Sequence, residues 1–168
     1  MATVPSSRSP RPTTDTSPLA ASGRRAIAVE IDALAAVADR LDGEFSAACQ
    51  LMLETRGRVV CTGMGKSGHI ARKIAATLAS TGTNAFFVHP AEMSHGDLGM
   101  LRPDVTVLAI SNSGESRELR DPLIYCQREG IPVIGITQRP NSFLGRNSAV
   151  CLTLPQVAEA CPNGLAPT

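Results

Sequence analysis

The chain has 168 residues, which is about the length of one domain. Its 16 lysines and arginines nearly balance its 15 aspartates and glutamates, so charge favours neither nucleic acid nor an acidic membrane surface as a partner. Hydrophobic residues make up 43% of the chain and aromatic residues 3%, which predicts an aliphatic core and excludes aromatic stacking on single strands as a general strategy. No apolar run reaches the roughly 18–20 residues that span a bilayer.

The five cysteines form neither a C-x-x-C pair nor the spacing of a zinc ribbon: Cys49, Cys61, Cys126, Cys151 and Cys161. Cys61 and Cys151 lie in apolar, strand-like runs, where a thiol behaves as a small buried hydrophobe. This usage of cysteine predicts a reduced, cytoplasmic protein.

Residues 1–22 are mostly Ser, Thr and Pro and contain almost no large apolar side chain. Such a segment cannot bury enough surface to offset its ordering entropy, so we expect a disordered tail. It lacks the apolar region of a secretory signal, and its Arg and Ser content leaves an organellar transit peptide as the alternative. It offers no helix-turn-helix for DNA.

A helical period follows from about residue 24 to residue 56. Steps of three, four and seven place one apolar stripe on one face, made of Ile27, Leu34, Val37, Leu41, Phe45, Ala48 and Met52. Gly43 is a candidate break between two helices. We expect this stretch to pack on the core or to form a dimerising arm.

Short apolar runs then alternate with helical stretches. We expect helices over 67–80 and 116–129, the second with Pro122 near its first turns. The expected strands are 58–62, 85–88, 105–110, 132–137 and 149–154. Continuous apolar strands between helices are typical of a parallel sheet covered on both faces. The predicted fold class is therefore α/β, a three-layer α/β/α sandwich around a five-stranded, doubly wound parallel sheet whose ligands bind beyond the carboxyl ends of the strands.

The loop after the first expected strand is residues 63–69, with the sequence GMGKSGH. A Walker A loop requires glycine where this chain has Val60, so a nucleotidase is disfavoured. The G-x-G-x-x-G dinucleotide fingerprint does match, but the second strand ends at His89 and Pro90 without the carboxylate that binds ribose. A helix N-terminus near Ser67 beside Lys66 still favours an anion.

The loop after the third expected strand carries three serines, an asparagine and a glycine in residues 111–116. Hydroxyl and backbone N–H groups around a helix N-terminus can cradle a phosphate without many cations. A plain helix N-cap is the alternative, but it needs only one serine. The pattern therefore favours an anion site.

Several runs together resemble a sugar isomerase (SIS) domain, which has a flavodoxin-like fold, and within that superfamily the bacterial D-arabinose 5-phosphate isomerases. The resemblance spans about residue 25 to the last residue. The runs are 63–69 (GMGKSGH), 79–83 (ASTGT), 88–90 (VHP), 95–100 (HGDLGM), 110–116 (ISNSGES) and 159–168 (EACPNGLAPT). It implies an aldose–ketose isomerase that interconverts D-ribulose 5-phosphate and D-arabinose 5-phosphate in the pathway to Kdo, a sugar of lipopolysaccharide.

By matching position, the resemblance implies Lys66, Glu118 and Glu159 as catalytic residues. Either glutamate is a candidate base, and Lys66 could polarise the carbonyl oxygen of the sugar. A solvated helix residue is the alternative for Glu118. The implied substrate-binding residues are Ser67, Gly82, Thr83, His89, His95, Ser111, Asn112, Ser113 and Ser116. No cofactor is required, although His89 is a candidate zinc contact; plain loop histidines are the alternative for it and for His95.

The resemblance also implies further chain after the ending Ala-Pro-Thr: a long helix, a His-Pro-Gly-Gly segment with another catalytic histidine, and a pair of CBS domains. We therefore expect residues 23–168 to be a SIS domain that is incomplete at its C-terminus, with reduced isomerase activity. The expected assembly is a homo-oligomer, a dimer or tetramer. A non-catalytic SIS module that binds a sugar phosphate is the alternative function, and a dinucleotide-binding protein is a third.

Overall fold

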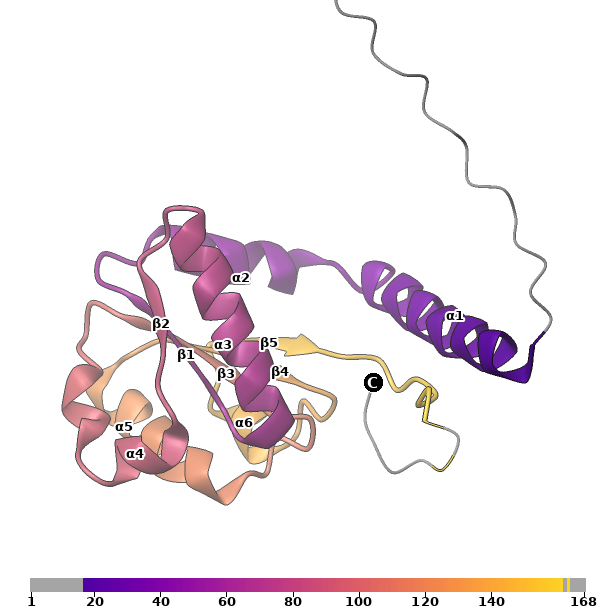
Figure 1. The fold of residues 1–168 in the computed structure, drawn as a ribbon. Helices are drawn as coiled ribbons and strands as arrows, with labels where there is room; N and C mark the ends of the chain where they lie inside the picture. Colours follow the sequence, from indigo (N-terminus) through magenta and orange to yellow (C-terminus); the bar gives the residue numbers. More distant parts are fainter. Residues whose placement is uncertain (1–16, 162, 164–168) are drawn as a thin grey trace, which may run out of the picture. The chain divides into compact units, whose positions relative to one another are not determined.

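Five parallel strands form one sheet in the order β2-β1-β3-β4-β5 (Figure 1). They are β1 (Val59–Gly63), β2 (Ala85–Phe87), β3 (Thr106–Ile110), β4 (Val133–Thr137) and β5 (Val150–Thr153). The first strand, β1, lies inside the sheet, with β2 on one side and β3, β4 and β5 following in order on the other. This order confirms the predicted doubly wound, five-stranded parallel sheet. β1 and β3 are entirely buried, as strands covered on both faces must be.

The structure is a computed structural model that describes residues 17–161 and residue 163. Its contacts divide the chain into two units. One is Ala36–Gln156, which contains the whole sheet, and the other takes in the described residues of 1–35 and 157–168. The stretch 23–168, for which the sequence predicts one domain, takes in residues of both units, and that prediction stays untested. None of the described helices is long and apolar enough to cross a membrane.

Helices cover both faces of the sheet, which confirms the predicted three layers (Figure 1). α2 (Gly43–Leu53) and α3 (Gly65–Ser80) pack on one face. The other face carries three helices and two 3₁₀ turns: α4 (Pro90–Ser94), η1 (Asp97–Met100), η2 (Arg117–Leu119), α5 (Arg120–Glu129) and α6 (Phe143–Arg146). Pro122 lies in the first turn of α5, where a missing N–H costs nothing, as the sequence predicts.

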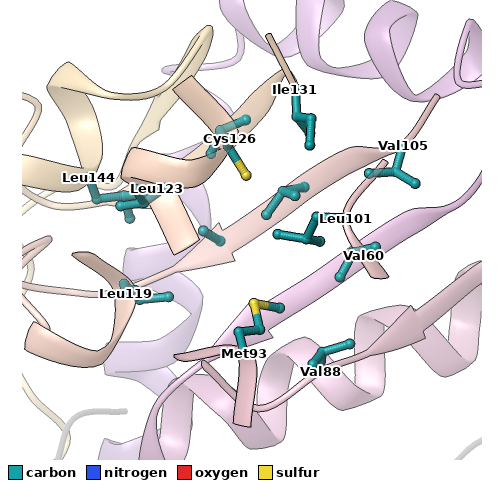
Figure 2. Packing of buried hydrophobic residues seen from close by; sticks show 13 residues of the cluster. Val60, Val88, Met93, Leu101, Val105, Leu119, Leu123, Cys126, Ile131 and Leu144 are labelled. Carbon is teal, nitrogen blue, oxygen red and sulfur yellow. The ribbon is translucent and has the colours of Figure 1, made fainter. Parts of the chain in front are cut away.

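Two aliphatic clusters fill the spaces between these layers. Val60 of β1 contributes to the cluster under α4, α5 and α6, which Figure 2 shows, whereas its neighbours Val59 and Cys61 face α2 and α3. Burial raises the pKa of the Cys61 and Cys126 thiols to about 12, so both stay protonated and serve as small hydrophobes. Cys151 is only half-buried.

Helix α1 (Pro18–Ala38) corrects the predicted tail, because it begins inside residues 1–22. Ser17 Oγ accepts a hydrogen bond from the Ala20 N–H (3.2 Å), and Pro18 occupies the first helical position, where proline is favoured. No residue of α1 is buried. The rest of the predicted tail, 1–16, lies outside the described residues.

The expected helical stretch from 24 to 56 is indeed two helices. α2 begins at Gly43, and the Asp42 carboxylate caps it by accepting from the Glu44 N–H (2.9 Å). The predicted apolar stripe is buried only near its end, at Ala48. Leu34 and Phe45 of the same stripe are exposed. The stripe therefore packs on the core only through α2.

Candidate functional site

The carboxyl ends of β1 and β3 lie side by side, because Gly63 of β1 pairs with Ile110 of β3. The loop 111–116 that follows β3 is internally hydrogen-bonded. Ser111 is buried, its Oγ lies 2.9 Å from Ser116 Oγ, and it accepts from the Gly114 N–H (3.1 Å). Ser113 Oγ accepts from the Glu115 N–H (3.2 Å). The turn is therefore formed before any ligand arrives.

Gly114 fastens this turn to the loop after β4. Its φ is +65°, and a Cβ there would lie 2.9 Å from Thr137 Oγ1 and would also overlap Ser142. Its carbonyl accepts from the Leu144 N–H at the start of α6 (2.9 Å). Only glycine fits this position, both because of the left-handed backbone and because no space exists for a side chain.

Asn112 is held in the same way, through its backbone. Its carbonyl oxygen accepts from the Gln138 N–H (3.1 Å) and from Thr137 Oγ1 (3.1 Å). The side chains of Asn112 and Ser113 are exposed. The loop thus combines a fixed backbone with two exposed polar side chains at the edge of the sheet.

The Glu115 carboxylate joins the loop 111–116 to α6 and α5; we call this set of contacts the carboxylate clamp, and the sequence did not indicate it. Glu115 accepts from the Phe143 N–H (2.9 Å) and pairs with Arg120 (3.3 Å), whose guanidinium lies 4.8 Å from the centre of the Phe143 ring. A cavity of about 390 Å³ beside the clamp is lined by Glu115 and residues 138–142. Glu115 stands in the run 110–116 that carries the resemblance, but the sequence indicated no role for it. Residues 138–142 form a polar run without a recognisable motif.

The two flanking glycines of G-x-G-x-x-G allow α3 to pack closely. A Cβ on Gly68 would lie 2.5 Å from the Gly63 oxygen, and one on Gly63 would lie 2.9 Å from the Ile110 oxygen. α3 begins at Gly65, two residues before the predicted start, so its first N–H groups have no partner within the helix and face this edge. Lys66 is exposed and Ser67 is half-buried.

The histidines lie beyond β2. His89 is half-buried at the start of α4, edge-on to Phe87 with ring centres 6.4 Å apart, and the guanidinium of Arg72 stacks 3.9 Å from the Phe87 centre. His95 is exposed at the other end of α4. Within the described residues, no group of three or more His, Cys, Asp or Glu side chains could hold a metal ion. A zinc contact at His89 therefore stays a prediction.

Glu118 lies in η2, directly after the loop 111–116, and is exposed. It forms no ion pair with any other described residue. The carboxylate thus projects into solvent from the same edge as Lys66. Glu159 is exposed and belongs to the other unit of the chain, so its catalytic role stays a prediction.

Gly82 and Thr83 lie before β2, at the amino edge of the sheet, and their role in substrate binding stays a prediction. Gly82 has φ +99°, and the Thr83 N–H donates to the Leu78 oxygen (2.9 Å), so the pair ends α3. The 16 residues of α3 span about 24 Å. Within one chain, these two residues cannot share a small ligand with Lys66.

The carboxyl edge thus gathers exposed polar side chains, helix N–H groups and one lysine around a fixed backbone. Such a set suits an anion, and phosphate in particular, because hydroxyl and N–H donors match its acceptor oxygens. Lys66 adds a mobile positive charge, and Glu118 adds a carboxylate able to accept a proton. The residues present suit phosphate binding combined with acid–base chemistry.

Comparison with known proteins agrees with this geometry. The chain is 50% identical over 146 residues to arabinose 5-phosphate isomerase KdsD of Escherichia coli, and 51% identical over 147 residues to the enzyme of the same name from Pseudomonas aeruginosa. These alignments cover 87% and 88% of this chain but only 44% and 45% of the two relatives. The chain therefore spans less than half the length of these relatives.

A solved structure is similar over most of its length. It is c3406 of E. coli CFT073 in complex with A5P, at 39% identity and a TM-score of 0.85, covering 92% of this chain and 82% of that one. The family match itself covers residues 52–168 and is to the SIS domain. These residues include every strand and both of the loops just described, and the chain belongs to the SIS domain family.

Proposed function

We propose that this chain binds a phosphorylated pentose and contributes to the interconversion of D-ribulose 5-phosphate and D-arabinose 5-phosphate. The observation that carries the proposal is the identity of about 50% to arabinose 5-phosphate isomerases over 146 residues. The similarity to c3406, solved in complex with A5P, supports the same substrate class.

The phosphate is held by the loop 111–116 and the start of α3. Asn112 and Ser113 present exposed side chains on a backbone that Thr137 and Gln138 hold in place. Ser67 and the first N–H groups of α3 supply further donors. Because these groups are mostly dipoles on a fixed backbone, binding the phosphate requires little reorganisation of the protein.

The isomerisation moves one proton between adjacent carbons. A glutamate removes the proton from C1 of the ketose while the electrons pass to the C2 oxygen, which gives an enediolate; Lys66 stabilises the negative oxygen. Transfer of the C1 hydroxyl proton to the C2 oxygen and delivery of the abstracted proton from the glutamate to C2 then produce the aldose. Glu118 and Glu159 are the two candidates for the base. The reaction is redox-neutral, so it needs no electron or hydride carrier.

The same proposal includes the cellular location of the protein and its oligomeric state. The free thiols of Cys49, Cys61, Cys126 and Cys151 support a reducing compartment, and we place the protein in the cytoplasm, where it supplies a precursor of the lipopolysaccharide sugar Kdo. Ile27, Leu34, Leu41 and Phe45 expose large apolar side chains on or beside α1 and α2. Such surface favours a dimer or tetramer over a monomer.

Interconversion of the two sugar phosphates tests the proposal directly. The assay uses the 168-residue chain and a chimera that appends the remaining C-terminal residues of the E. coli relative, with that relative assayed alongside. Turnover by the chimera is the expected result. Binding of D-arabinose 5-phosphate without turnover by either protein would instead assign a non-catalytic sugar-phosphate module, and absence of binding would overturn the proposal.

A further inference from the structure

Three arginines gather at the amino edge of the sheet, opposite the loops described above. Arg56 and Arg58 precede β1, and Arg102 precedes β3; we call them the amino-edge arginines. All three line one cavity of about 450 Å³, together with Asn84, Phe86, Met100 and a single carboxylate, Asp104. The walls of this cavity therefore carry three positive charges against one negative charge.

Backbone hydrogen bonds connect the segments that carry these arginines. The Gly57 N–H donates to the Asp104 oxygen (2.8 Å), the Thr106 N–H donates to the Arg58 oxygen (3.1 Å), and the Val59 N–H donates to the Asn84 oxygen (2.9 Å). A Cβ on Gly57 would lie 2.7 Å from the Asp104 oxygen, so only glycine permits this close approach. The cavity wall is thus a fixed part of the sheet edge.

The guanidinium groups of this wall are not neutralised by the protein. Among the described residues, none of the three arginines forms an ion pair or a side-chain hydrogen bond, and Asp104 pairs with none of them. The Arg58 guanidinium lies 5.5 Å from the centre of the Phe86 ring. Glu54 lines a neighbouring cavity that shares Arg56 and Asp104. Positive charges that line one cavity repel one another, and a bound anion reduces that repulsion.

We propose that the amino-edge arginines form a second anion site, which takes the phosphate group of a small metabolite. Guanidinium forks match the paired oxygens of a phosphate, and the cavity is of the size of small-molecule sites. Phe86 and Met100 add an apolar wall for the remainder of the ligand. The site is distinct from the carboxyl edge, since the five residues of β1 separate the two by about 16 Å.

Amide chemical-shift changes in the ¹⁵N-labelled protein identify which edge is occupied. The probes are pyrophosphate, ATP and D-arabinose 5-phosphate, which distinguish a bare phosphate group, a nucleotide and a sugar phosphate as its source. We expect pyrophosphate to shift the amides of Gly57, Arg58, Asn84 and Asp104. Signals of residues 111–116 report separately on the proposed substrate site, so failure of one proposal does not affect the other.

Matched variants decide whether position or overall charge matters. Arg58→Gln/Arg102→Gln should weaken pyrophosphate binding at the amino edge by about tenfold or more, because each lost charged hydrogen bond contributes substantially. Arg25→Gln/Arg128→Gln removes the same charge elsewhere and should change the affinity by less than about twofold. The single Arg102→Gln variant removes no ion pair or side-chain hydrogen bond among the described residues. Weakened binding by this variant would show that the loss in the double variant does not arise from misfolding. Equal weakening in both double variants, or shifts confined to residues 111–116, would overturn the second site.

Discussion

The two edges of the sheet differ in the kind of polar group that they present. The carboxyl edge offers hydroxyls, an amide and helix N–H groups on a turn whose backbone is fixed by Thr137, Gln138 and Leu144. The amino edge offers three guanidinium groups that form no ion pair with another described residue. One edge attracts an anion mainly by oriented dipoles, and the other by net charge, which salt screens more strongly. A strand can therefore place two chemically different anion sites at its two ends.

Replacing Gly114 by alanine should have the largest effect, because it breaks the turn of the carboxyl edge. Strain from φ +65° and overlap with Ser142 and Thr137 each cost about 1–3 kcal/mol, so we expect about 2–6 kcal/mol of destabilisation in denaturant unfolding. Gly130→Ala is the matched control, since Gly130 has φ +67° with open space around its Cβ position and should cost about 1–2 kcal/mol. Equal losses would show that the packing against Ser142 contributes nothing.

Lys66→Met tests whether the carboxyl edge carries the chemistry. Loss of the charge that stabilises the enediolate should lower turnover by about 10²–10³-fold in the chimera with the E. coli C-terminal residues. Lys73→Met, an exposed lysine further along α3, should leave turnover unchanged. If the two variants retain the same turnover, Lys66 is not the electrophile.

Ser113→Ala probes the phosphate loop with a smaller expected effect. Loss of a hydrogen bond to a charged phosphate should weaken D-arabinose 5-phosphate binding by about 1.5–3 kcal/mol in calorimetric titration. Ser80→Ala, at the end of α3, should bind normally. Unphosphorylated D-arabinose should give no thermal protection to the wild type, and protection equal to that by the phosphate ester would contradict the assignment of this loop.

The buried thiols between the two edges should make the stability of the protein depend on pH. Burial raises the pKa of Cys61 and Cys126 from 9.0 to about 12 in the folded protein, so the unfolded chain loses its thiol protons first as pH rises. Their contribution to stability is present below pH 9 and is lost between pH 9 and 12, at about 1 kcal/mol per thiol for each pH unit. Unfolding midpoints at pH 8 and pH 10 should therefore separate more in the wild type than in Cys61→Ala/Cys126→Ala. Identical pH dependence of the two proteins would show that the thiols do not titrate differently on unfolding.

The pattern of apolar residues along the sequence predicted the five strands correctly, but it did not predict the short helices. All five strands are apolar runs of four to six residues in the sequence, and each appears in the structure within one or two residues of its expected bounds. α4 and α6 were not predicted, because helices of five and four residues are too short to show a period. Pro90 and the Ser142 cap start these helices where the chain leaves β2 and β4.

The sequence by itself determined the fold class and the loop 111–116 as a candidate anion site, since both follow from composition and spacing along the chain. Only the tertiary structure decided which of the implied site residues lie together. It placed Gly82 and Thr83 at the amino edge, joined Glu115 to Phe143 across 28 positions, and brought Arg102 beside Arg56 and Arg58. The physical reason is that parallel pairing of β1 and β3 sets loops distant in sequence side by side, and no local pattern records that register.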